Sequence, residues 1–367
     1  MEFGQGFLEE LVMNQSFWKG KTVLVTGHTG FKGSWLSIVL KKFGANIIGF
    51  SKDIPSEPNM YTIARVQDGI KNIVGNINDS NHINQVFEEN KPEIVIHMAA
   101  QAIVRESYKN PLETFSTNVM GTANILDAVR NSNSVRVVII VTSDKSYRTK
   151  KDNSKYFEDD PMGGYDPYSS SKGCAELVTA SYRNSFFNPL KYSEHKVAVA
   201  SVRAGNVIGG GDWGLDRLVP DIVRGIKNKS TVVIRNPEST RPWQFVLDPL
   251  FGYLMLAEKM WDNGQEFSQG WNFGPTIDEE ITVKWILEFI KKQIGEELNL
   301  EINNSPQPHE EKHLRLNCSK AINQLEWKSK MNLEKTLLWT INWYNEYMKN
   351  KNMKEFTEKQ IDEFLVV

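Results

Sequence analysis

Short apolar runs of strand length recur through the first 200 residues, and most are followed by a turn and then by apolar residues spaced three and four apart. Short apolar runs bounded by turn residues predict buried strands, whereas the wider spacing predicts amphipathic helices. Strands alternating with helices in this way predict a doubly wound α/β fold with a parallel, Rossmann-type sheet. The expected strands lie at 22–26, 46–50, 73–77, 93–98, 135–141 and 198–203.

The second half of the chain differs from the first because it holds most of the 10 tryptophans and a glycine-dense loop at 205–211. We expect a dinucleotide-binding domain at 18–200, to which the chain returns near 245–275, and a smaller C-terminal substrate-binding domain that occupies most of 201–350. Residues 1–17 and 351–367 are expected to be tails.

A glycine-rich turn follows the first expected strand directly. It contains Gly27, Gly30 and Gly33, with Thr29 and Phe31 between them. Glycine lets the backbone approach a pyrophosphate closely, and the free N–H groups at the start of the next helix attract the anion. The Gly-x-x-Gly-x-x-Gly spacing is a relative of the Gly-x-Gly-x-x-Gly dinucleotide fingerprint. The turn therefore predicts a dinucleotide site, with a merely tight structural turn as the alternative.

Asp53 follows the second expected strand, about 20 residues beyond Gly33, where an acid can bind the 2′-hydroxyl of the adenosine ribose. This position favours NAD as the cofactor. Ser51 and Lys52 could instead hold a 2′-phosphate, which makes NADP the less favoured alternative. The alternative is that Asp53 is a solvated acidic residue in a loop, without a role in binding.

Further cofactor contacts are expected where the third and fourth strands end, because ligands of parallel α/β sheets bind beyond the carboxyl ends of the strands. Two alanines after the fourth strand leave room for a cofactor to lie against the backbone. The expected contact residues are Asn76, Ile77, Ala99, Ala100 and Gln101.

Candidate catalytic groups follow the fifth expected strand, which ends in Ser143, Asp144 and Lys145. Tyr168 and Lys172 lie four apart on a helix expected to begin at Pro167, and they project on one face. An ammonium one turn away would lower the phenol pKa from near 10 towards working pH. Tyr168 could then take a hydroxyl proton while hydride leaves for a nicotinamide, which is alcohol oxidation. A surface tyrosine over a lysine stem is the alternative.

Charge and composition narrow the class of protein. The 367-residue chain is 40% hydrophobic and carries a formal net charge of -2, so it can bury a core and offers no basic field for nucleic acid. We find neither a membrane-length apolar run nor a signal-peptide pattern, and therefore expect a cytoplasmic protein without a membrane partner. Cys174 and Cys318 suit a reducing compartment as core thiols.

A zinc-protease pattern, His-Glu-x-x-His, occurs from His309 to His313. It follows a proline-rich stretch, lacks the apolar face of a buried zinc helix and has no obvious third ligand. We therefore expect no metal.

Several long segments resemble the extended short-chain dehydrogenase/reductases that modify nucleotide sugars. The resemblance covers about residues 17–347 and is nearest the branch whose members dehydrate CDP-glucose. The segments are GHTGFKGSWLS, HMAAQ, STNVMGT, TSDKSY, DPMGGYDPYSSSKGCAEL, VRAGNVIGGGDW, RPWQFVLDPL and GWNFGP.

The resemblance implies roles for further residues. Asn118 would support the active-site residues and lie near the cofactor, whereas Asn206, Arg217 and Arg241 would approach the nucleotide diphosphate. Arg105 is a further candidate for binding the substrate. A planar guanidinium such as that of Arg241 is well suited to phosphate.

The family's reaction oxidises C4 of the hexose, removes water across C5 and C6, and returns the hydride to C6. The product is a 4-keto-6-deoxy sugar for deoxysugar and surface-polysaccharide synthesis, such as that of O-antigen lipopolysaccharide. Asp144 is the candidate acid for the departing C6 hydroxyl. In the related dTDP-glucose dehydratases a glutamate serves as the C5 base, and Lys145 stands at that position here. Lys145 would act as the base in its neutral form or stabilise the enolate.

Three alternatives share parts of this pattern: a nucleotide-sugar 4-epimerase, a dehydratase of another nucleoside-diphosphate hexose, and a redox-sensing protein that binds a dinucleotide only as a ligand. An epimerase needs no acid at a leaving hydroxyl, which favours the dehydratase. Family members pair through two helices, so a homodimer or homotetramer is expected, with contacts from 113–129 and 168–186.

Overall fold

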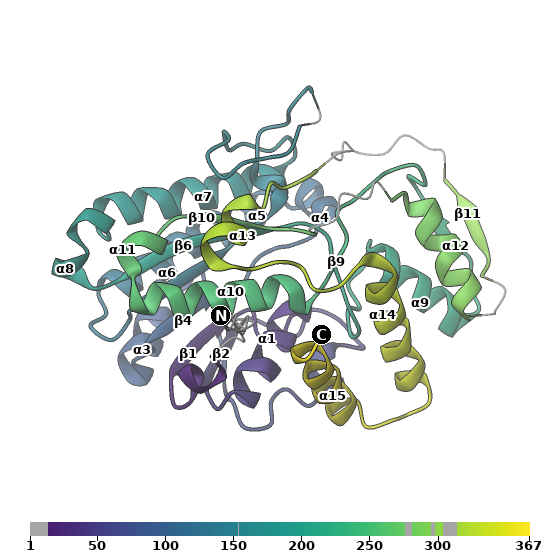
Figure 1. Ribbon diagram of the computed structural model, residues 1–367, viewed down its shortest axis with the longest axis horizontal. Helices are drawn as coiled ribbons and strands as arrows, with labels where there is room; N and C mark the ends of the chain where they lie inside the picture. The colour runs from purple at the N-terminus through teal and green to yellow at the C-terminus, as the bar shows by residue number, and fades with distance from the viewer. Residues whose placement is uncertain (1–13, 153, 276–280, 295–297, 304–313) are drawn as a thin grey trace, which may run out of the picture.

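The computed structural model describes residues 14–152, 154–275, 281–294, 298–303 and 314–367, and its centre is a seven-stranded sheet (Figure 1). All neighbouring strands in it are parallel, in the order β10-β6-β5-β4-β1-β2-β3. This doubly wound order, extended by one strand beyond β6, confirms the predicted Rossmann-type fold. The strands are β1 (Thr22–Thr26), β2 (Asn46–Ser51), β3 (Lys71–Val74), β4 (Ile94–His97), β5 (Val137–Val141), β6 (Ala198–Ala204) and β10 (Gly270–Phe273).

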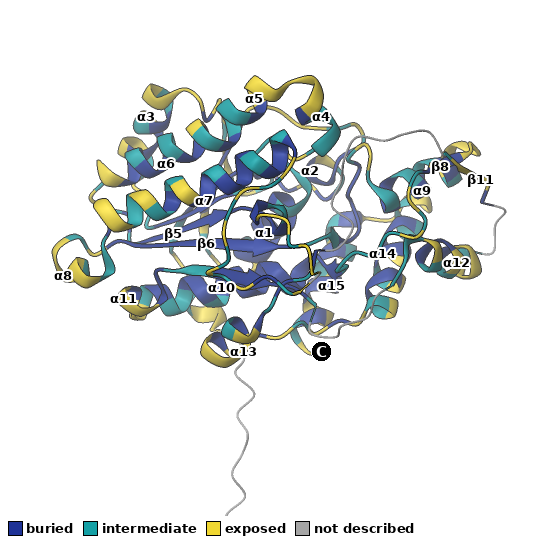
Figure 2. Ribbon diagram, turned by 90° about the horizontal axis from the view of Figure 1, so that it is seen from above, coloured by how far each residue is buried: buried dark blue, intermediate teal, exposed yellow. Residues whose placement is uncertain are grey.

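Helices cover both faces of the sheet because alternate strand residues bury apolar side chains on opposite sides. Val23 and Val25 of β1 join one core with the first set of helices, whereas Leu24 joins the other core. In Figure 2, α10 lies on one side of β5 and β6, and α3, α6 and α7 lie on the other. The first set is α1 (Phe31–Lys42) and α10 (Leu247–Asp262), and the second is α3 (Ser80–Asn90), α6 (Gly121–Arg130) and α7 (Pro167–Ser185).

A smaller region stands beside the large sheet and is built largely from the second half of the chain (Figure 1). It contains two small parallel sheets, in which β11 pairs with β8 and β7 pairs with β9. Its elements are β7 (Val207–Ile208), β8 (Val232–Ile234), β9 (Gln244–Phe245), β11 (Leu300–Ile302), α9 (Leu218–Asn228), α12 (Val283–Ile294) and α14 (Leu333–Met348).

Shorter helices connect these elements. They are α2 (Met60–Ile63), α4 (Val104–Lys109), α5 (Pro111–Phe115), α8 (Tyr192–His195), α11 (Gly264–Phe267) and α13 (Ser319–Leu325).

Five of the six expected strands are confirmed to within about two residues, but the third was placed too late. β3 ends at Val74, which pairs with Ser51, the last residue of β2. A turn follows at once, because the side chain of Asn76 accepts a hydrogen bond from Asn78 N at 3.0 Å. Asn76 and Ile77 therefore lie in a loop beyond the strand.

The last residues of the chain are not the expected tail. They form α15 (Met353–Leu365), whose residues Ile361 and Phe364 are buried. Phe364 packs against Phe251 with ring centroids 5.0 Å apart, and Lys42 of α1 pairs with Asp362 at 2.7 Å. The sequence does contain the pattern of this helix, because apolar residues recur at helical spacing between the charged ones. The division into two domains stays a prediction.

The helix expected over 113–129 is present but contains an irregular turn. A π-helical turn, Ser116–Met120, separates α5 from α6 and holds Asn118. Such turns carry one extra residue within a helix and often mark functional sites.

No helix in the described part of the chain has the length and apolar character required to cross a membrane. Cys174 and Cys318 are both free thiols, and Cys318 is buried.

Candidate active site

The glycine-rich turn leaves no room for side chains at two of its positions. A Cβ on Gly33 would lie 2.2 Å from Gly27 O, and a Cβ on Gly27 would lie 2.7 Å from Ala99 N. Gly27 also has a positive φ of 74°, which favours glycine. Gly30 caps α1 without a side-chain hydrogen bond, so the first amides of α1 are left for an anion. The turn thus fits the pyrophosphate of a dinucleotide.

The residues beyond β2 lie against the same turn. Thr29 Oγ1 donates to Asp53 O at 2.6 Å, which holds the exposed Asp53 beside the glycines. Ser51 Oγ is within 2.8 Å of His28 Nδ1, and Lys52 pairs with Glu113 at 3.4 Å. The two groups that could have held a 2′-phosphate are therefore engaged elsewhere.

Asn118 connects the end of β4 to the catalytic helix. Its side chain accepts from Gln101 N at 2.9 Å and donates to Gln101 O at 3.0 Å. It also donates to Ser171 Oγ at 2.8 Å, and Ser171 Oγ donates to Tyr168 O at 2.7 Å. The segment with Ala99 and Ala100 is thus held next to the first turn of α7.

Helix α7 begins as the sequence predicts. Asp166 caps it by accepting from Ser169 N at 2.9 Å and from Ser169 Oγ at 2.6 Å, and Pro167 occupies the first turn. The cap fixes the position of Tyr168, whose N donates to Ser107 Oγ at 3.1 Å.

The structure brings Ser143, Asp144 and Tyr168 together at the end of β5. The Ser143 hydroxyl lies near enough to the Tyr168 phenol to lower its pKa, and Ser143 Oγ donates to Asp144 Oδ1 at 3.1 Å. The backbone N of Lys145 donates to Ser143 Oγ at 3.2 Å, so Lys145 follows directly in the same turn. All except Lys145, which is half-buried, are buried.

The pKa of Tyr168 is not lowered as the sequence analysis expected. Burial raises the pKa of the phenol to about 12, and Asp144 adds to the rise. Ser143 and the Arg217 guanidinium oppose it, so the opposing cation is Arg217 rather than Lys172. The prediction failed because burial and a distant arginine cannot be inferred from a four-residue spacing.

Lys172 is buried on the same helix face and its Nζ donates to Val141 O at 3.3 Å. Burial lowers the pKa of this ammonium to about 8, and Glu176 opposes the change. His97, at the end of β4, is buried with Nδ1 within 2.7 Å of Thr26 Oγ1. Burial and the Lys172 charge lower the pKa of His97 to about 3, so His97 is neutral.

Asp144 has the features of an acid. Burial raises the pKa of its carboxyl, against the opposing effects of Lys145, Ser143 and Arg241. Its Oδ2 is buried and has no hydrogen-bond partner among the described residues. Gly205 borders this oxygen, because a Cβ there would lie 3.1 Å from it. The Asp144 carboxyl therefore combines a raised pKa with one oxygen that has no partner among the described residues.

The polar residues predicted to bind substrate come from several segments of the chain. Asn206 follows Gly205 and its carbonyl accepts from Gln244 N at 2.9 Å. Arg217 donates to Asp212 Oδ1 and Oδ2, both at 2.9 Å, and its charge acts on Tyr168.

Arg105 and Arg241 complete this set. Arg105 pairs with Asp216, next to Arg217, at 3.8 Å. Arg241 donates to Thr240 O at 2.9 Å, and its charge acts on Asp144.

Lys32 and Tyr253 lie near the same site and were not predicted from the sequence. Lys32 Nζ donates to Tyr253 OH at 3.4 Å, and its pKa is lowered to about 8 by burial and by the charges of Lys172 and Arg217. Lys32 was readable as a charged residue inside the glycine-rich turn. Tyr253 lies in an apolar stretch of α10 and gave no signal.

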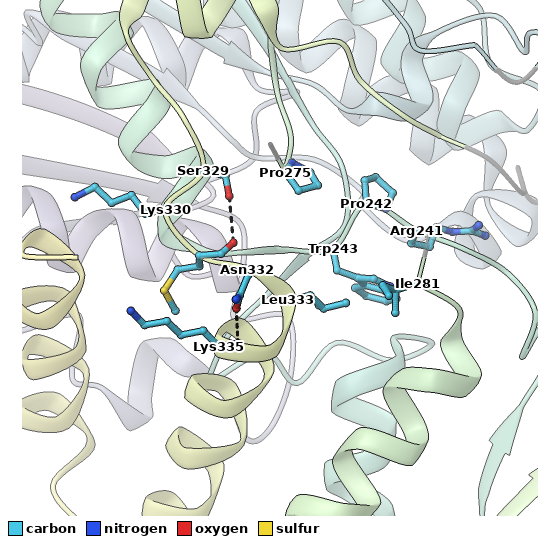
Figure 3. A pocket seen from close by; sticks show the side chains of 11 residues that line it. Arg241, Pro242, Trp243, Pro275, Ile281, Ser329, Lys330, Asn332, Leu333 and Lys335 are labelled. Carbon is cyan, nitrogen blue, oxygen red and sulfur yellow. Dashed lines mark hydrogen bonds between the residues drawn. The ribbon is translucent and has the colours of Figure 1, made fainter. Parts of the chain in front are cut away.

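A cavity of about 290 Å³ lies beside this set of residues in the smaller region. The side chains of Trp243, Ile281 and Leu333 come together in it, whereas Arg241 points away from them (Figure 3). Tyr168 and Asp144 do not line it. Its lining residues are Arg241, Pro242, Trp243, Pro275, Ile281, Ser329, Lys330, Met331, Asn332, Leu333 and Lys335.

The zinc-protease pattern at His309 to His313 lies outside the described residues. Within the described ranges, no group of three or more histidine, cysteine or acidic side chains could hold a metal ion.

Known proteins resemble this chain over nearly its whole length. A CDP-glucose 4,6-dehydratase of Salmonella typhimurium is 46% identical over 354 residues, which are 96% of this chain and 99% of that protein. The crystal structure of a dTDP-glucose 4,6-dehydratase from Bacillus anthracis, in complex with NAD, has a TM-score of 0.73 at 21% identity and covers 89% of this chain and 97% of that one.

A UDP-glucuronic acid 4-epimerase from Bacillus cereus, solved with UDP-glucuronic acid and NAD, has a TM-score of 0.75 at 20% identity and covers 89% of this chain and 99% of that one. At identities of 21% and 20%, these two structures show only that the fold is shared. The sequence profile of the family described as GDP-mannose 4,6 dehydratase matches residues 24–338. The resemblance to extended short-chain dehydrogenase/reductases is thereby confirmed, and the chain belongs to the GDP-mannose 4,6 dehydratase family.

Proposed function

We propose that this chain is an NAD-dependent 4,6-dehydratase that converts CDP-D-glucose to CDP-4-keto-6-deoxy-D-glucose. The observation that carries the proposal is the cluster of Ser143, Asp144 and Tyr168, in which Asp144 keeps a buried carboxyl oxygen without a partner among the described residues. A phenol, a hydroxyl and a carboxyl with a raised pKa at one point can serve both an alcohol oxidation and a loss of water.

The residues of the turn fit NAD. Gly27 and Gly33 form a cradle that a Cβ would fill, and the uncapped start of α1 would receive the pyrophosphate. Asp53 would bind the 2′-hydroxyl of the adenosine ribose, and the engaged side chains of Ser51 and Lys52 favour NAD over NADP. Bound NAD would supply the acceptor of a hydride from C4 and its donor to C6.

Each chemical step has a residue of this chain assigned to it. Tyr168, beside Ser143, would take the proton of the C4 hydroxyl. The Arg217 charge favours the phenolate, and the Lys172 ammonium would assist from one turn further along α7. Asp144 would then give its proton to the departing C6 hydroxyl, so that water leaves. Burial raises the pKa of this carboxyl, which favours the protonated form that the step requires.

Lys145 is the candidate at C5. It follows Asp144 in the same turn and would either take the C5 proton or stabilise the enolate formed next to the C4 ketone. In the Lys145→Met variant, both exchange of the C5 proton with solvent and turnover should fall. If both persist at the wild-type level, neither role holds.

The substrate assignment depends on the relative at 46% identity, which is a CDP-glucose 4,6-dehydratase. Arg217 acts on Tyr168 and Arg241 acts on Asp144, and together with Asn206 and Arg105 they would hold the diphosphate. A 4-epimerase shares the fold but needs no acid at C6, so Asp144 favours the dehydratase.

The decisive experiment offers CDP-, dTDP-, UDP- and GDP-glucose in turn to the purified chain. The 4-keto-6-deoxy product is followed by its absorbance in alkali, and the bound nucleotide is extracted and identified. We expect keto sugar from CDP-glucose and NAD as the nucleotide. A 4-epimer without keto sugar would favour the epimerase, and bound dinucleotide without any sugar conversion would favour the sensor.

We also propose that the chain forms a homodimer or homotetramer through the helical stretches 113–129 and 168–186, and that it works in the cytoplasm. Large apolar side chains are exposed in or directly before these stretches, with Leu112 at 84%, Met120 at 55% and Leu177 at 60% exposure. Figure 2 shows α5, α6 and α7 side by side. Light scattering after size-exclusion chromatography should give at least twice the 42.0 kDa mass of one chain.

A further inference from the structure

Glu176 lies one turn beyond Lys172 on α7 and is buried, yet it takes no part in the chemistry proposed above. All of its hydrogen-bonding capacity is directed at the interior. Oε1 accepts from Thr142 Oγ1 and from Arg203 Nε at 2.8 Å. Oε2 accepts from Ser201 Oγ at 2.6 Å and from Arg203 Nη2 at 2.7 Å.

This carboxylate joins the two elements that carry the catalytic groups. Thr142 directly precedes Ser143 at the end of β5, whereas Lys172 is on α7 with Glu176. Because Thr142 donates to Glu176, the end of β5 is tied to the helix four residues from Lys172. The end of β5 is therefore held against α7 by the Glu176 carboxylate as well as by the hydrogen bond from Lys172 to Val141 O.

Arg203 anchors the carboxylate from the other side. Its Nη1 donates to Tyr147 OH at 2.6 Å and to Glu158 O at 2.9 Å, and Tyr147 OH donates to Asn272 Oδ1 at 2.7 Å. Although burial opposes ionisation, Arg203 and the other donors keep the pKa of Glu176 below its ordinary value. The pair is thus fully charged, and the network holds it rigidly in place.

The charges around Lys172 make Glu176 important to its protonation. Lys32 of α1 is a like charge, and His97 at the end of β4 is neutral. On its own helix Lys172 has Tyr168 one turn before it and Glu176 one turn after it. Glu176 is the group that raises the pKa of Lys172 against the lowering effect of burial.

We propose that Glu176 is a positioning residue that ties the end of β5 to α7 and keeps Lys172 in its ammonium form. The inference depends on the proposed function, because it assumes that Lys172 assists C4 oxidation. Glu176 touches neither substrate nor cofactor in this scheme and acts through Thr142 and Lys172.

The test is the pH profile of keto-sugar formation by the holoenzyme carrying Glu176→Gln, which keeps the shape and removes the charge. The alkaline limb, where Lys172 loses its proton, should move down by about one pH unit, while KM for CDP-glucose changes little. Because the pKa of Lys172 is about 8 in the wild type, the rate at pH 8 should fall about fivefold. Ser201→Ala is the matched control, because it removes a hydrogen bond to the same carboxylate but keeps the charge and should leave the limb in place.

Glu176→Gln leaves the buried Arg203 unpaired and can therefore unfold the protein. The double variant Glu176→Gln, Arg203→Met removes both charges, and a smaller shift in the same direction is expected from it. Thr142→Val keeps both charges and tests the tie alone, with kcat expected to fall several-fold at every pH and the limb unmoved.

An unmoved limb in folded Glu176→Gln or in the double variant overturns the electrostatic part of the proposal, and an unchanged kcat in Thr142→Val overturns the positioning part. If the wild-type chain itself forms no keto sugar, the proposed function fails instead. The two failures are therefore distinguishable.

Discussion

Two aspartates are buried to the same degree and yet differ in what surrounds them. Asp144 and Asp248 are 2% and 1% exposed, and each has an Oδ2 without a hydrogen-bond partner among the described residues. Burial raises the pKa of both carboxyls, that of Asp248 to about 7. By burial and pKa alone, either could be taken for a functional acid.

Their neighbours distinguish them. Asp144 lies beside Ser143 and is acted on by the charges of Lys145 and Arg241, at the ends of parallel strands. Asp248 lies in the first turn of α10, where it accepts from Lys330 N at 2.7 Å and its carbonyl accepts from Trp327 Nε1 at 3.0 Å.

The Asp248 contacts attach α10 to the segment that leads into α14, so Asp248 serves packing. A raised carboxyl pKa therefore indicates a catalytic role only where other reactive side chains lie next to the carboxyl. This difference gives opposite expectations for the two Asp→Asn variants.

The largest expected effect is that of Asp144→Asn on turnover. Dehydration of CDP-glucose should fall about 10²- to 10⁴-fold, the usual contribution of a general acid, because the amide cannot protonate the leaving hydroxyl. Reduction of bound NAD, measured at 340 nm, should persist because Tyr168 and Ser143 are intact. Asp248→Asn is the matched control and should keep the wild-type rate, whereas wild-type dehydration by Asp144→Asn would remove Asp144 from the mechanism.

The second expected effect is that of Asp248→Asn on stability. The folded pKa of Asp248, about 7, lies above its ordinary value of 3.8, so the folded state binds the proton more tightly. Its contribution to stability is thus present at low pH and lost as pH rises from about 4 to 7, by up to about 4 kcal/mol.

The Asn variant should lack this loss when the free energy of unfolding is measured in urea at pH 5 and pH 8. An unchanged difference between the two pH values would show that the pKa of Asp248 is not raised in the folded state.

The smallest expected effect comes from the cations that mark the site. Arg217 opposes the raised pKa of Tyr168, so Arg217→Gln should raise that pKa further and slow C4 oxidation about tenfold at pH 8. Arg217→Lys retains the charge and should recover most of the rate when NAD reduction is followed in single turnovers. Equal rates for both variants would mean that Arg217 acts through geometry rather than charge.

The fold and the backbone-dependent part of the site could be predicted from the sequence because their signals are local. The apolar runs gave the strands, and the glycine spacing gave the turn, whose requirement for Gly27 and Gly33 is confirmed by steric contact. Asp166 and Pro167 gave the start of α7 in the same way.

The electrostatic part could not be predicted because it depends on residues that only the tertiary structure brings together. Tyr168 meets Arg217 and Asp144 across long stretches of sequence, and burial dominates its pKa. The ion pair between Glu176 and Arg203 could not be predicted either, because only the tertiary structure brings the two side chains together. The helix within residues 351–367 was not predicted for a different reason. Its apolar residues do recur at helical spacing, but the many charged residues between them suggested a solvent-exposed tail.

The π-helical turn at Ser116–Met120 also affects how mutations in this stretch would act. Because one surplus residue is accommodated there, the helices before and after it keep their own faces towards the core. Shortening the turn by a single position should therefore let the chain wind normally and fold. The same deletion would draw the amide of Asn118 away from Ser171 and Gln101. The deletion variant would then fold but lose activity, so this turn is required for catalysis and not for folding.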